Sequence, residues 1–375
     1  MAFLLGEVRF LWYSAFVMKT EILELNGSSR DAAKLKHAVR LLQSGALVAF
    51  PTETVYGLGA DARNAEALAR LTLAKGRPDG KPFSLLIPSL QSAEELCGPL
   101  PPIAQKLARL YWPGPLTMAL PRRGGGSVGL RLPEHPVTRA LLIQCGFPLA
   151  APSANISGHP DPIRAEQVLK EMAGRIPLIL DGGPAWMGKP STVIKIENSG
   201  PPKVLRKGVI TTEEIMLASR MTILFVCAGN TCRSPIAEVL CRHALKEQTP
   251  AAVPGTETGP GFRVVSAGSS AVAGYPADPL AQEVMREIGL DLSEHKTQAL
   301  TPRLIDSSDF IFTMTRSQRE SIIEWMPEAR ERVRLLSPTS EDIADPVSHP
   351  LEVYRSCRAT IASCLREVLK GVKVT

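Results

Sequence analysis

Segments rich in apolar residues recur along the chain, and their spacing is of two kinds. Short, mostly apolar runs predict buried strands, and they lie at 46–50, 83–87, 178–180, 223–226, 262–267 and 309–313. Longer segments have apolar residues at every third or fourth position and predict helices, at 30–42, 65–74, 105–111, 235–246, 280–288 and 354–368. Strands that alternate with helices in this way predict an α/β fold.

The chain is long enough for two domains, because 375 residues exceed what one hydrophobic core usually supports. We place the division at 209–220, a helix that opens with a capping box of Thr211 and Glu214. The predicted domains are therefore 18–208 and 221–375. Residues 1–17 include an apolar stretch that is too short to span a membrane and has no basic n-region before it. We expect this segment to be an untranslated or disordered extension, with an anchor as the alternative.

The second predicted domain opens with a strand, a polar loop and a helix, in the sequence MTILFVCAGNTCRSP. Pro235 suits the first turn of the helix. The amides of such a loop and the helix N-terminus point to one place, where both favour negative charge. The sequence therefore predicts a phosphate loop, made of Ala228, Gly229, Asn230, Thr231, Cys232 and Ser234.

Two reactive groups flank this loop. The amides that bind an anion should also stabilise the thiolate of Cys227, which makes it a nucleophile near neutral pH. Arg233 can hold a phosphate through two parallel hydrogen bonds. A bare Cys-x5-Arg is a weak signal, and the strand, the glycine, the Ser-Pro pair and the helix make it specific. Together they predict a phosphocysteine intermediate.

From Met221 to the C-terminus the chain resembles the low-molecular-weight protein-tyrosine phosphatase family. That resemblance implies a doubly wound parallel sheet, no cofactor, and a general acid on an Asp-Pro loop late in the chain. Asp345, followed by Pro346, stands at that place before the final helix. An aspartic acid there would protonate the leaving group and then activate the water that cleaves phosphocysteine.

The substrate of this second domain is left open between phosphotyrosine and phosphoarginine. Thr231 resembles the bacterial protein-arginine phosphatases, whereas tyrosine-directed relatives often carry an aliphatic residue there. Val347 also lacks the aromatic ring that would flank a phosphotyrosine. Both features favour phosphoarginine. Arsenate reductase, the rival on this fold, needs two cysteines after the third strand, where this chain has Thr313-Met314-Thr315.

The remaining cysteines predict no disulfide framework. There are seven cysteines without a Cys-x2-Cys pair and six scattered histidines, which indicates a reducing cytosol and no metal site. Cys232 could form a protective disulfide with Cys227, because both lie in one short loop. Cys357 and Cys364 share the apolar face of the last helix and are predicted core residues. The net charge of +6 suits a phosphate-rich ligand, but only weakly.

In the first predicted domain, polar and basic loops follow strands again and again. Their sequences are PTETVYGLG at 51–59, KGRP at 75–78, WPGPLT at 112–117, LRLPEHP at 130–136, APSANISG at 151–158, STVI at 191–194 and LRKG at 205–208. As an ordered set they resemble the YrdC/Sua5 family, over about residues 20–210. The resemblance implies a twisted α/β sheet with a deep basic cavity for ATP, L-threonine and bicarbonate.

The same resemblance implies roles for particular residues. Thr52 and Arg131 would bind threonine, and ATP would be bound by Lys75, Arg77, Thr117, Ser153, Asn155, Ser191 and Arg206. ATP would be a substrate, accompanied by Mg²⁺. A carbamate formed from threonine would attack the α-phosphate and release pyrophosphate, so positioning and cations should matter more than a nucleophilic side chain.

Leu85-Leu86 stands where long members of the family carry a histidine, which indicates a short-type site. We therefore expect a fused bifunctional enzyme of the cytoplasm, with no membrane partner. Its first half would make L-threonylcarbamoyladenylate for tRNA position 37, with the tRNA threonylcarbamoyl-transferase complex, and tRNA itself, as partners. Its second half would act on a phosphoprotein. The alternatives are a tRNA-binding module without ATP turnover, joined to a regulatory or arsenate-reductase-like domain.

Overall fold

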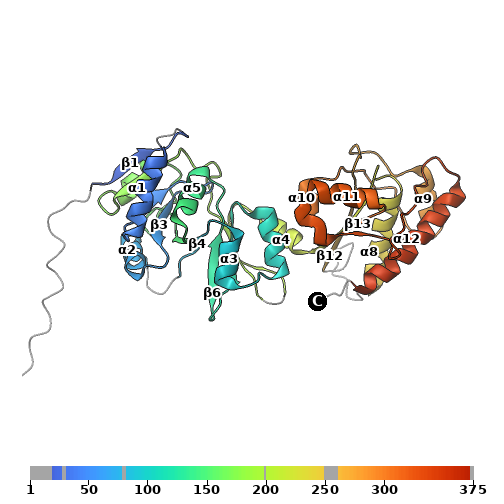
Figure 1. Cartoon of the computed structure of the whole chain (residues 1–375), viewed down its shortest axis with the longest axis horizontal. Helices are drawn as coiled ribbons and strands as arrows, with labels where there is room; N and C mark the ends of the chain where they lie inside the picture. The colour runs from blue at the N-terminus through green and yellow to red at the C-terminus, as the bar shows by residue number, and fades with distance from the viewer. Residues whose placement is uncertain (1–18, 28–30, 78–81, 198–199, 249–260, 372–375) are drawn as a thin grey trace, which may run out of the picture. The chain divides into compact units, whose positions relative to one another are not determined.

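A computed structural model of the chain describes residues 19–27, 31–77, 82–197, 200–248 and 261–371 (Figure 1). Contacts divide the chain into unit 1, Met1–Met216, and unit 2, Leu217–Thr375. The division falls within α7 (Thr212–Ser219), whose predicted capping box is present, since the Thr211 and Glu214 amides each donate to the other's side chain. The predicted extension at 1–17 lies outside the described residues.

In its described residues, unit 1 contains a mixed sheet of ten strands in the order β1-β8-β2-β3-β7-β4-β6-β5-β9-β10. The strands are β1 (Glu21–Glu24), β2 (Val48–Phe50), β3 (Gly57–Asp61), β4 (Leu85–Leu86), β5 (Leu116–Pro121), β6 (Ser127–Arg131), β7 (Leu149–Ala150), β8 (Leu178–Asp181), β9 (Thr192–Lys195) and β10 (Lys203–Arg206). Strands distant in sequence are neighbours, as with β3 and β7, so loops from many parts of the chain meet over this sheet.

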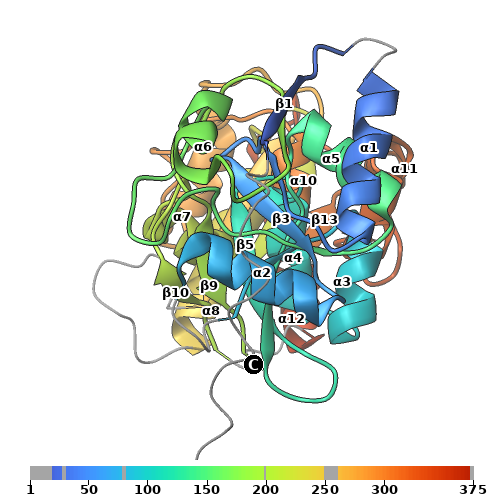
Figure 2. The same cartoon turned by 90° about the vertical axis from the view of Figure 1, so that its left-hand side faces the viewer.

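Helices cover both faces of this sheet. They are α1 (Asp31–Gln43), α2 (Ala65–Lys75), α3 (Leu90–Cys97), α4 (Pro102–Tyr111), α5 (Pro136–Cys145) and α6 (Ala165–Met172). Side chains of β2 alternate between two cores: Val48 and Phe50 pack with α1 and α5, and Ala49 packs with α2 and α6. Figure 2 shows α1 and α5 on one side of β3 and α6 on the other. The predicted α/β layering of this domain is confirmed.

Unit 2 contains, in its described residues, a parallel sheet of four strands in the order β12-β11-β13-β14. The strands are β11 (Met221–Cys227), β12 (Phe262–Gly268), β13 (Phe310–Thr313) and β14 (Val333–Leu335). The helical segments are α8 (Arg233–Gln248), α9 (Pro279–Arg286), α10 (Pro302–Ser307), α11 (Arg316–Trp325), the 3₁₀ turn η1 (Pro327–Arg332) and α12 (Leu351–Gly371).

Alternate residues of β11 serve the two cores of unit 2. Ile223 and Phe225 pack with α8, α9 and α12, whereas Leu224 and Val226 pack with α10, α11 and η1. Figure 1 shows these two groups of helices on opposite sides of the strands. The predicted doubly wound parallel sheet is therefore confirmed. Its strand order changes direction between β11 and β13, and ligands bind at such a point in open α/β sheets.

Candidate active sites

The described part of unit 1 contains a cavity of about 340 Å³. Every residue assigned above to threonine or ATP lines it: Thr52, Lys75, Arg77, Thr117, Arg131, Ser153, Asn155, Ser191 and Arg206. These residues come from segments spread over more than 150 positions, and the crossing connections of the sheet bring them to one place. The cavity wall is strongly cationic, because four of the nine side chains are Lys or Arg.

Lys75 is the last residue of α2, which Asn64 caps at its start and Gly76 ends in the left-handed conformation. The Lys75 ammonium donates to the carbonyls of Ser153, at 2.6 Å, and Asn155, at 2.7 Å, and to Asn155 Oδ1 at 3.2 Å. Burial lowers the Lys75 pKa to about 8, although Asp161 opposes the shift. Lys75 therefore holds the loop after β7 in shape as well as lining the cavity.

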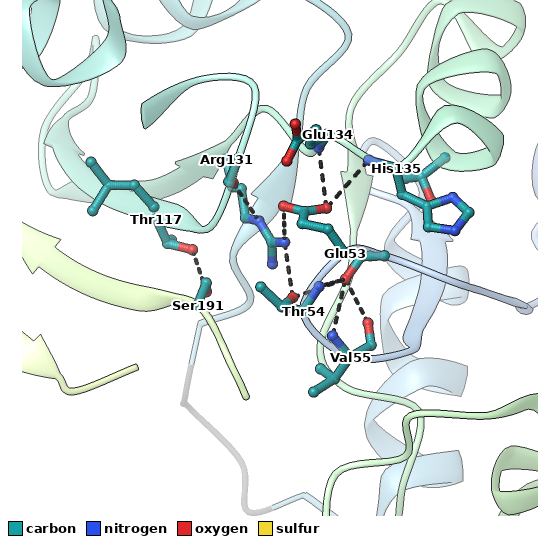
Figure 3. A network of polar contacts seen from close by, with 12 residues as sticks. Glu53, Thr54, Val55, Thr117, Arg131, Glu134, His135 and Ser191 are labelled. Carbon is teal, nitrogen blue, oxygen red and sulfur yellow. Dashed lines mark hydrogen bonds and ion pairs between the residues drawn. The ribbon is translucent and has the colours of Figure 1, made fainter. Parts of the chain in front are cut away.

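A second polar cluster lies where β5 and β9 begin. Thr117 and Ser191 exchange a hydrogen bond of 2.9 Å between their hydroxyls (Figure 3). Arg206 donates through Nη2 to the Ser191 hydroxyl and carbonyl, both at 2.9 Å. Burial lowers the pKa of Arg206, with Asp161 again acting in the opposite direction. Arginine remains charged in proteins, so this cluster presents hydroxyls beside a fixed cation, as phosphate binding requires.

Arg131 ends β6 and is paired with a residue that the sequence analysis missed. Its Nη2 donates to Glu53 Oε1 at 2.6 Å and to the Thr54 hydroxyl at 2.9 Å (Figure 3). Its Nε donates to the carbonyl of Gly114 at 3.1 Å. Glu53 is fully buried. A glutamate between two threonines, directly after a buried strand, was the available signal, because a buried carboxylate needs a cationic partner.

Thr52 shapes its own loop. Its hydroxyl donates to the Val55 carbonyl at 2.6 Å and accepts from the amides of Thr54 and Val55, both at 3.2 Å. Side-chain turns of this kind fix loop backbones. Further lining residues were given no role by the sequence analysis: Tyr56 and Ser157, which lie inside two of the motifs, and His159 and Asp161, which follow the second of them. Asp161 is the one carboxylate among the lining residues of the described chain.

In unit 2, Cys227 lies at the carboxyl end of β11, and α8 begins at Arg233, with the predicted phosphate loop between them. Cys227 Sγ is 3.0 Å from the Ser234 hydroxyl and accepts the Asn230 amide at 3.2 Å. The thiol is nearly fully buried, at 3% exposure. The sulfur thus contacts one amide and one hydroxyl beside the N-terminus of a 16-residue helix, where the helix favours negative charge.

Asn230 holds the loop from within. It has a φ of 57°, which asparagine tolerates better than most residues. Its side-chain nitrogen, Nδ2, donates to the hydroxyls of Ser234, at 3.0 Å, and Ser266, at 2.8 Å. Its Oδ1 accepts from the Gln298 amide at 2.9 Å. Ser266 and Gln298 lie far from the loop in sequence, so nothing in the sequence alone connected them with it.

Arg233 and Asp345 meet although 112 residues separate them. The Arg233 Nη2 forms an ion pair with Asp345 Oδ2, and Nη1 donates to the Ile343 carbonyl at 2.9 Å. The Arg233 Nε is buried and has no hydrogen-bond partner in the described chain. A buried donor of this kind is costly unless a ligand supplies an acceptor, and a phosphate oxygen would do so.

The other residues predicted around this site differ in how deeply they are buried. Burial raises the pKa of Cys232 to about 11, so this thiol remains protonated. Thr231 Oγ1 lies 3.4 Å from Cys232 Sγ. Val347, beside the Asp-Pro pair, is exposed. Cys357 and Cys364 are buried in the core that contains α12, which confirms them as core residues. No cluster of three or more metal-ligating side chains occurs in the described ranges.

Comparison with known proteins divides the chain at the same place. A family described as telomere recombination, Sua5_yciO_yrdC, matches residues 40–208, and low molecular weight phosphotyrosine protein phosphatase matches residues 222–375. A Mycobacterium tuberculosis protein described as a threonylcarbamoyl-AMP synthase is 37% identical over 205 residues, which are 52% of this chain and 94% of that relative. The low-molecular-weight protein-tyrosine phosphatase EpsP of Ralstonia nicotianae is 39% identical over 152 residues, 40% of this chain and 90% of EpsP.

The chain belongs to the Sua5/YrdC family in unit 1 and to the low-molecular-weight phosphatase family in unit 2. Both predicted resemblances are thus confirmed. The threonylcarbamoyl-AMP synthase of Bacillus subtilis is 43% identical over 197 residues, 50% of this chain, and the chain spans 57% of that relative's length. A solved structure of Sua5 from P. abyssi matches with a TM-score of 0.50 and 29% identity, over 78% of this chain and 99% of Sua5.

No helix in the described residues combines the length and apolar character needed to cross a bilayer.

Proposed function

We propose that the chain is a fused enzyme, which makes L-threonylcarbamoyladenylate in unit 1 and hydrolyses phosphorylated protein side chains in unit 2. The observation that carries the first half is the single cavity that all nine assigned side chains line. The observation that carries the second half is the meeting of Cys227, Arg233 and Asp345 around a phosphate loop at a helix N-terminus.

In unit 1 the reaction needs no nucleophilic side chain. The amine of L-threonine takes up bicarbonate to give a carbamate, whose oxygen attacks the α-phosphate of ATP and expels pyrophosphate. Thr52 and Arg131 hold the amino acid. Lys75, Arg77 and Arg206 hold the nucleotide together with the polar groups of Thr117, Ser153, Asn155 and Ser191. These fixed cations and donors stabilise the charge that develops on phosphorus, since they need no reorganisation at the moment of reaction.

Mg²⁺ accompanies ATP in this proposal, and the residues present fit it. Mg²⁺ in nucleotide sites is usually bound by the substrate phosphates, several waters and one or two carboxylates. Asp161 is the carboxylate that lines the described cavity, and its negative charge acts on both Lys75 and Arg206 by raising the pKa of each against the effect of burial. Mg²⁺ would neutralise phosphate charge there, and Asp161 would hold it. Unit 2 needs no cofactor.

The product is a mixed anhydride, and its acyl group is activated for transfer to an amine. We assign its use to threonylcarbamoylation of tRNA at position 37, through a tRNA threonylcarbamoyl-transferase complex. The seven cysteines are all free thiols in the structure, which supports a reducing compartment and hence the cytoplasm.

The test of unit 1 is incubation of the purified chain with ATP, L-threonine and bicarbonate. Pyrophosphate should appear only when all three are present. Release of pyrophosphate without threonine, or none at all, would contradict the synthase proposal. Tight tRNA binding without ATP turnover would instead favour the RNA-binding alternative.

In unit 2 the substrate phosphate displaces Asp345 from Arg233, and Asp345 takes up a proton once this ion pair is broken. The Cys227 thiolate then attacks phosphorus, and Asp345 gives its proton to the leaving group. Arg233 binds two phosphate oxygens, and its unpartnered Nε is one of the donors that become satisfied. The ion pair with Asp345 keeps Arg233 beside the loop until the phosphate arrives. Asp345, 44% exposed on its side chain, can then activate the water that attacks phosphocysteine.

We assign phosphoarginine as the substrate of unit 2, on the strength of Thr231 in the loop and the absence of a ring at Val347. Cys227→Ser should abolish hydrolysis of p-nitrophenyl phosphate while pyrophosphate synthesis persists. Thr231→Ile should lower the ratio of phosphoarginine to phosphotyrosine turnover, because it replaces the hydroxyl on which the phosphoarginine assignment rests with an aliphatic side chain. An unchanged ratio would contradict the assignment and leave phosphotyrosine as the substrate.

A further inference from the structure

Glu53 is a fully buried carboxylate with donors on both of its oxygens. Its Oε1 accepts from Arg131 Nη2 at 2.6 Å, and its Oε2 accepts from the amides of Glu134, at 3.1 Å, and His135, at 3.3 Å (Figure 3). Those amides lie at the start of α5, where a helix favours negative charge. Figure 3 shows the carboxylate between the Arg131 guanidinium and the backbone of this turn.

The pair joins four separate loops of unit 1. Glu53 lies in the loop after β2, and Arg131 is the last residue of β6. The Glu53 backbone carbonyl also accepts from the Met187 amide at 2.9 Å. Arg131 Nε contacts the carbonyl of Gly114, whose own amide donates to Leu132 at 2.8 Å. These contacts use Nε and Nη2 of Arg131, and no partner contacts Nη1 among the described residues. The guanidinium is thus fixed in place, with one edge available at the cavity wall.

The pair also divides the cavity by charge. Glu53 and Arg131 have 0% and 8% of their side chains exposed, so solvent screens their attraction little. Arg131 is neutralised by this contact. Lys75 and Arg206, by contrast, contact only neutral oxygens among the described residues. The other cations of the cavity wall are Lys75, Arg77 and Arg206, and Asp161 is the one carboxylate that lines the described cavity. Asp161 acts electrostatically on Lys75 and Arg206, whereas the charge of Arg131 is offset by the buried carboxylate of Glu53.

We propose that Glu53 is a positioning and specificity-determining residue, which holds the Arg131 guanidinium at the amino-acid end of the cavity and cancels its charge. A zwitterion such as L-threonine then binds there, while polyphosphate is directed to the other cations of the cavity, Lys75, Arg77 and Arg206. This inference rests on the proposed synthase function of unit 1. It adds that the division between the two substrates depends on a carboxylate that touches neither of them.

Glu53→Gln in the full chain removes the charge and keeps the size of the side chain. The amide of glutamine can accept on one side only, so either Arg131 or the α5 amides lose their acceptor. The KM for L-threonine should rise about tenfold or more, as expected for a lost hydrogen bond to a charged group. The KM for ATP should change less than about twofold. Inhibition by inorganic pyrophosphate should become stronger, because Arg131 is now an uncompensated cation.

Glu53→Asp distinguishes the effect of the charge from the effect of the geometry. It also provides a second test of the proposal if Glu53→Gln does not fold. It keeps the negative charge but is shorter by one methylene, so the KM for L-threonine should rise without stronger inhibition by pyrophosphate. Glu134→Gln is the matched control, since it removes the same charge from an exposed side chain and keeps the Glu134 backbone amide that donates to Glu53. Glu134→Gln should leave both KM values and the inhibition unchanged.

A purely structural role of Glu53 would lower kcat through loss of folded enzyme and leave both KM values unchanged, and this result would overturn the proposal. Equal increases in both KM values would overturn it as well. L-threonine binding by calorimetry distinguishes the two proposals. If the wild-type chain binds threonine but releases no pyrophosphate, the synthase proposal fails, and weaker binding by Glu53→Gln still supports the role of Glu53. If the wild-type chain binds no threonine, both proposals fail.

Discussion

At the scale of single residues, Lys75 illustrates how a cation can be both buried and useful. Only 3% of it is exposed, and its three donors point to oxygens of the loop that carries Ser153 and Asn155. Burial disfavours the charged form, which is why the pKa falls to about 8. In the proposed synthase, the same charge would meet the phosphates of ATP.

This arrangement predicts a pH dependence of stability. The unfolded chain keeps the Lys75 proton up to about pH 10.5, whereas the folded chain releases it near pH 8. Between these values the folded state binds fewer protons, so its stability rises with pH, by up to about 1.4 kcal/mol per pH unit.

Chemical denaturation of wild type and Lys75→Met, from pH 7 to pH 10, isolates this contribution. The free energy of unfolding of wild type should increase relative to that of the variant above pH 8. A difference that stays constant with pH would show that the Lys75 charge is not penalised by burial.

At the scale of elements, β12 supports the phosphate loop through a glycine. A Cβ built on Gly268 would lie 2.4 Å from the Ala228 carbonyl and 2.9 Å from the Asn230 amide. Both neighbours are backbone atoms of the loop, so they cannot move without displacing it. The end of β12 therefore sets the height of the loop above the sheet, and only glycine allows this close approach.

Gly268→Ala should consequently disturb the phosphatase more than the fold. We expect a loss of about 1–3 kcal/mol of stability from overpacking. A shift of the loop by about 1 Å should lower p-nitrophenyl phosphate hydrolysis roughly a hundredfold.

Gly261→Ala, before the other end of β12, is the matched control, because a Cβ there would meet nothing within 4 Å. It should leave both stability and hydrolysis nearly unchanged. Equal activity of the two variants would contradict the supporting role of Gly268. Pyrophosphate synthesis should be unaffected by either substitution.

At the scale of the whole molecule, each unit closes its own hydrophobic cores. Those of unit 1 are built on β2 and its neighbours, and those of unit 2 on β11 and its neighbours. A compact unit with its own core can unfold as a cooperative transition of its own. The fusion therefore joins two sites that each depend on local packing.

Calorimetry of the full chain should resolve two unfolding transitions. ATP should raise the midpoint of one, and inorganic phosphate, which we expect to bind the predicted phosphate loop, should raise the other. At a concentration of 100 Kd each ligand should contribute about 2.7 kcal/mol. Cys227→Ser and Arg206→Ala identify which transition belongs to which unit. A single transition that both ligands shift equally would contradict independent unfolding.

The sequence alone determined the features that are written in neighbouring residues. The phosphate loop is one, because a buried strand, a glycine-containing loop and a helix start follow one another from Met221 to Pro235, and this local geometry needs no distant partner. The sequence also predicted the two α/β folds, through alternating segments and ordered motifs. In the first domain it missed α3, α5 and α6, whose short amphipathic patterns stand between proline-rich and polar loops. In the second domain it missed α10 and α11.

Only the tertiary structure decided how distant groups are paired. Glu53 pairs with Arg131, 78 positions away, and Asn230 forms hydrogen bonds with Ser266 and Gln298. These contacts form because the strand order of each sheet brings together segments that are far apart in the chain. The predicted strand at 83–87 is reduced to Leu85–Leu86, since its neighbour β7 has only two residues and β6 pairs with it only at Leu130 and Arg131. Charge and hydrogen bonding act through space, so residue types could identify the chemistry, while the fold decided which charges are neutralised and which face the ligand.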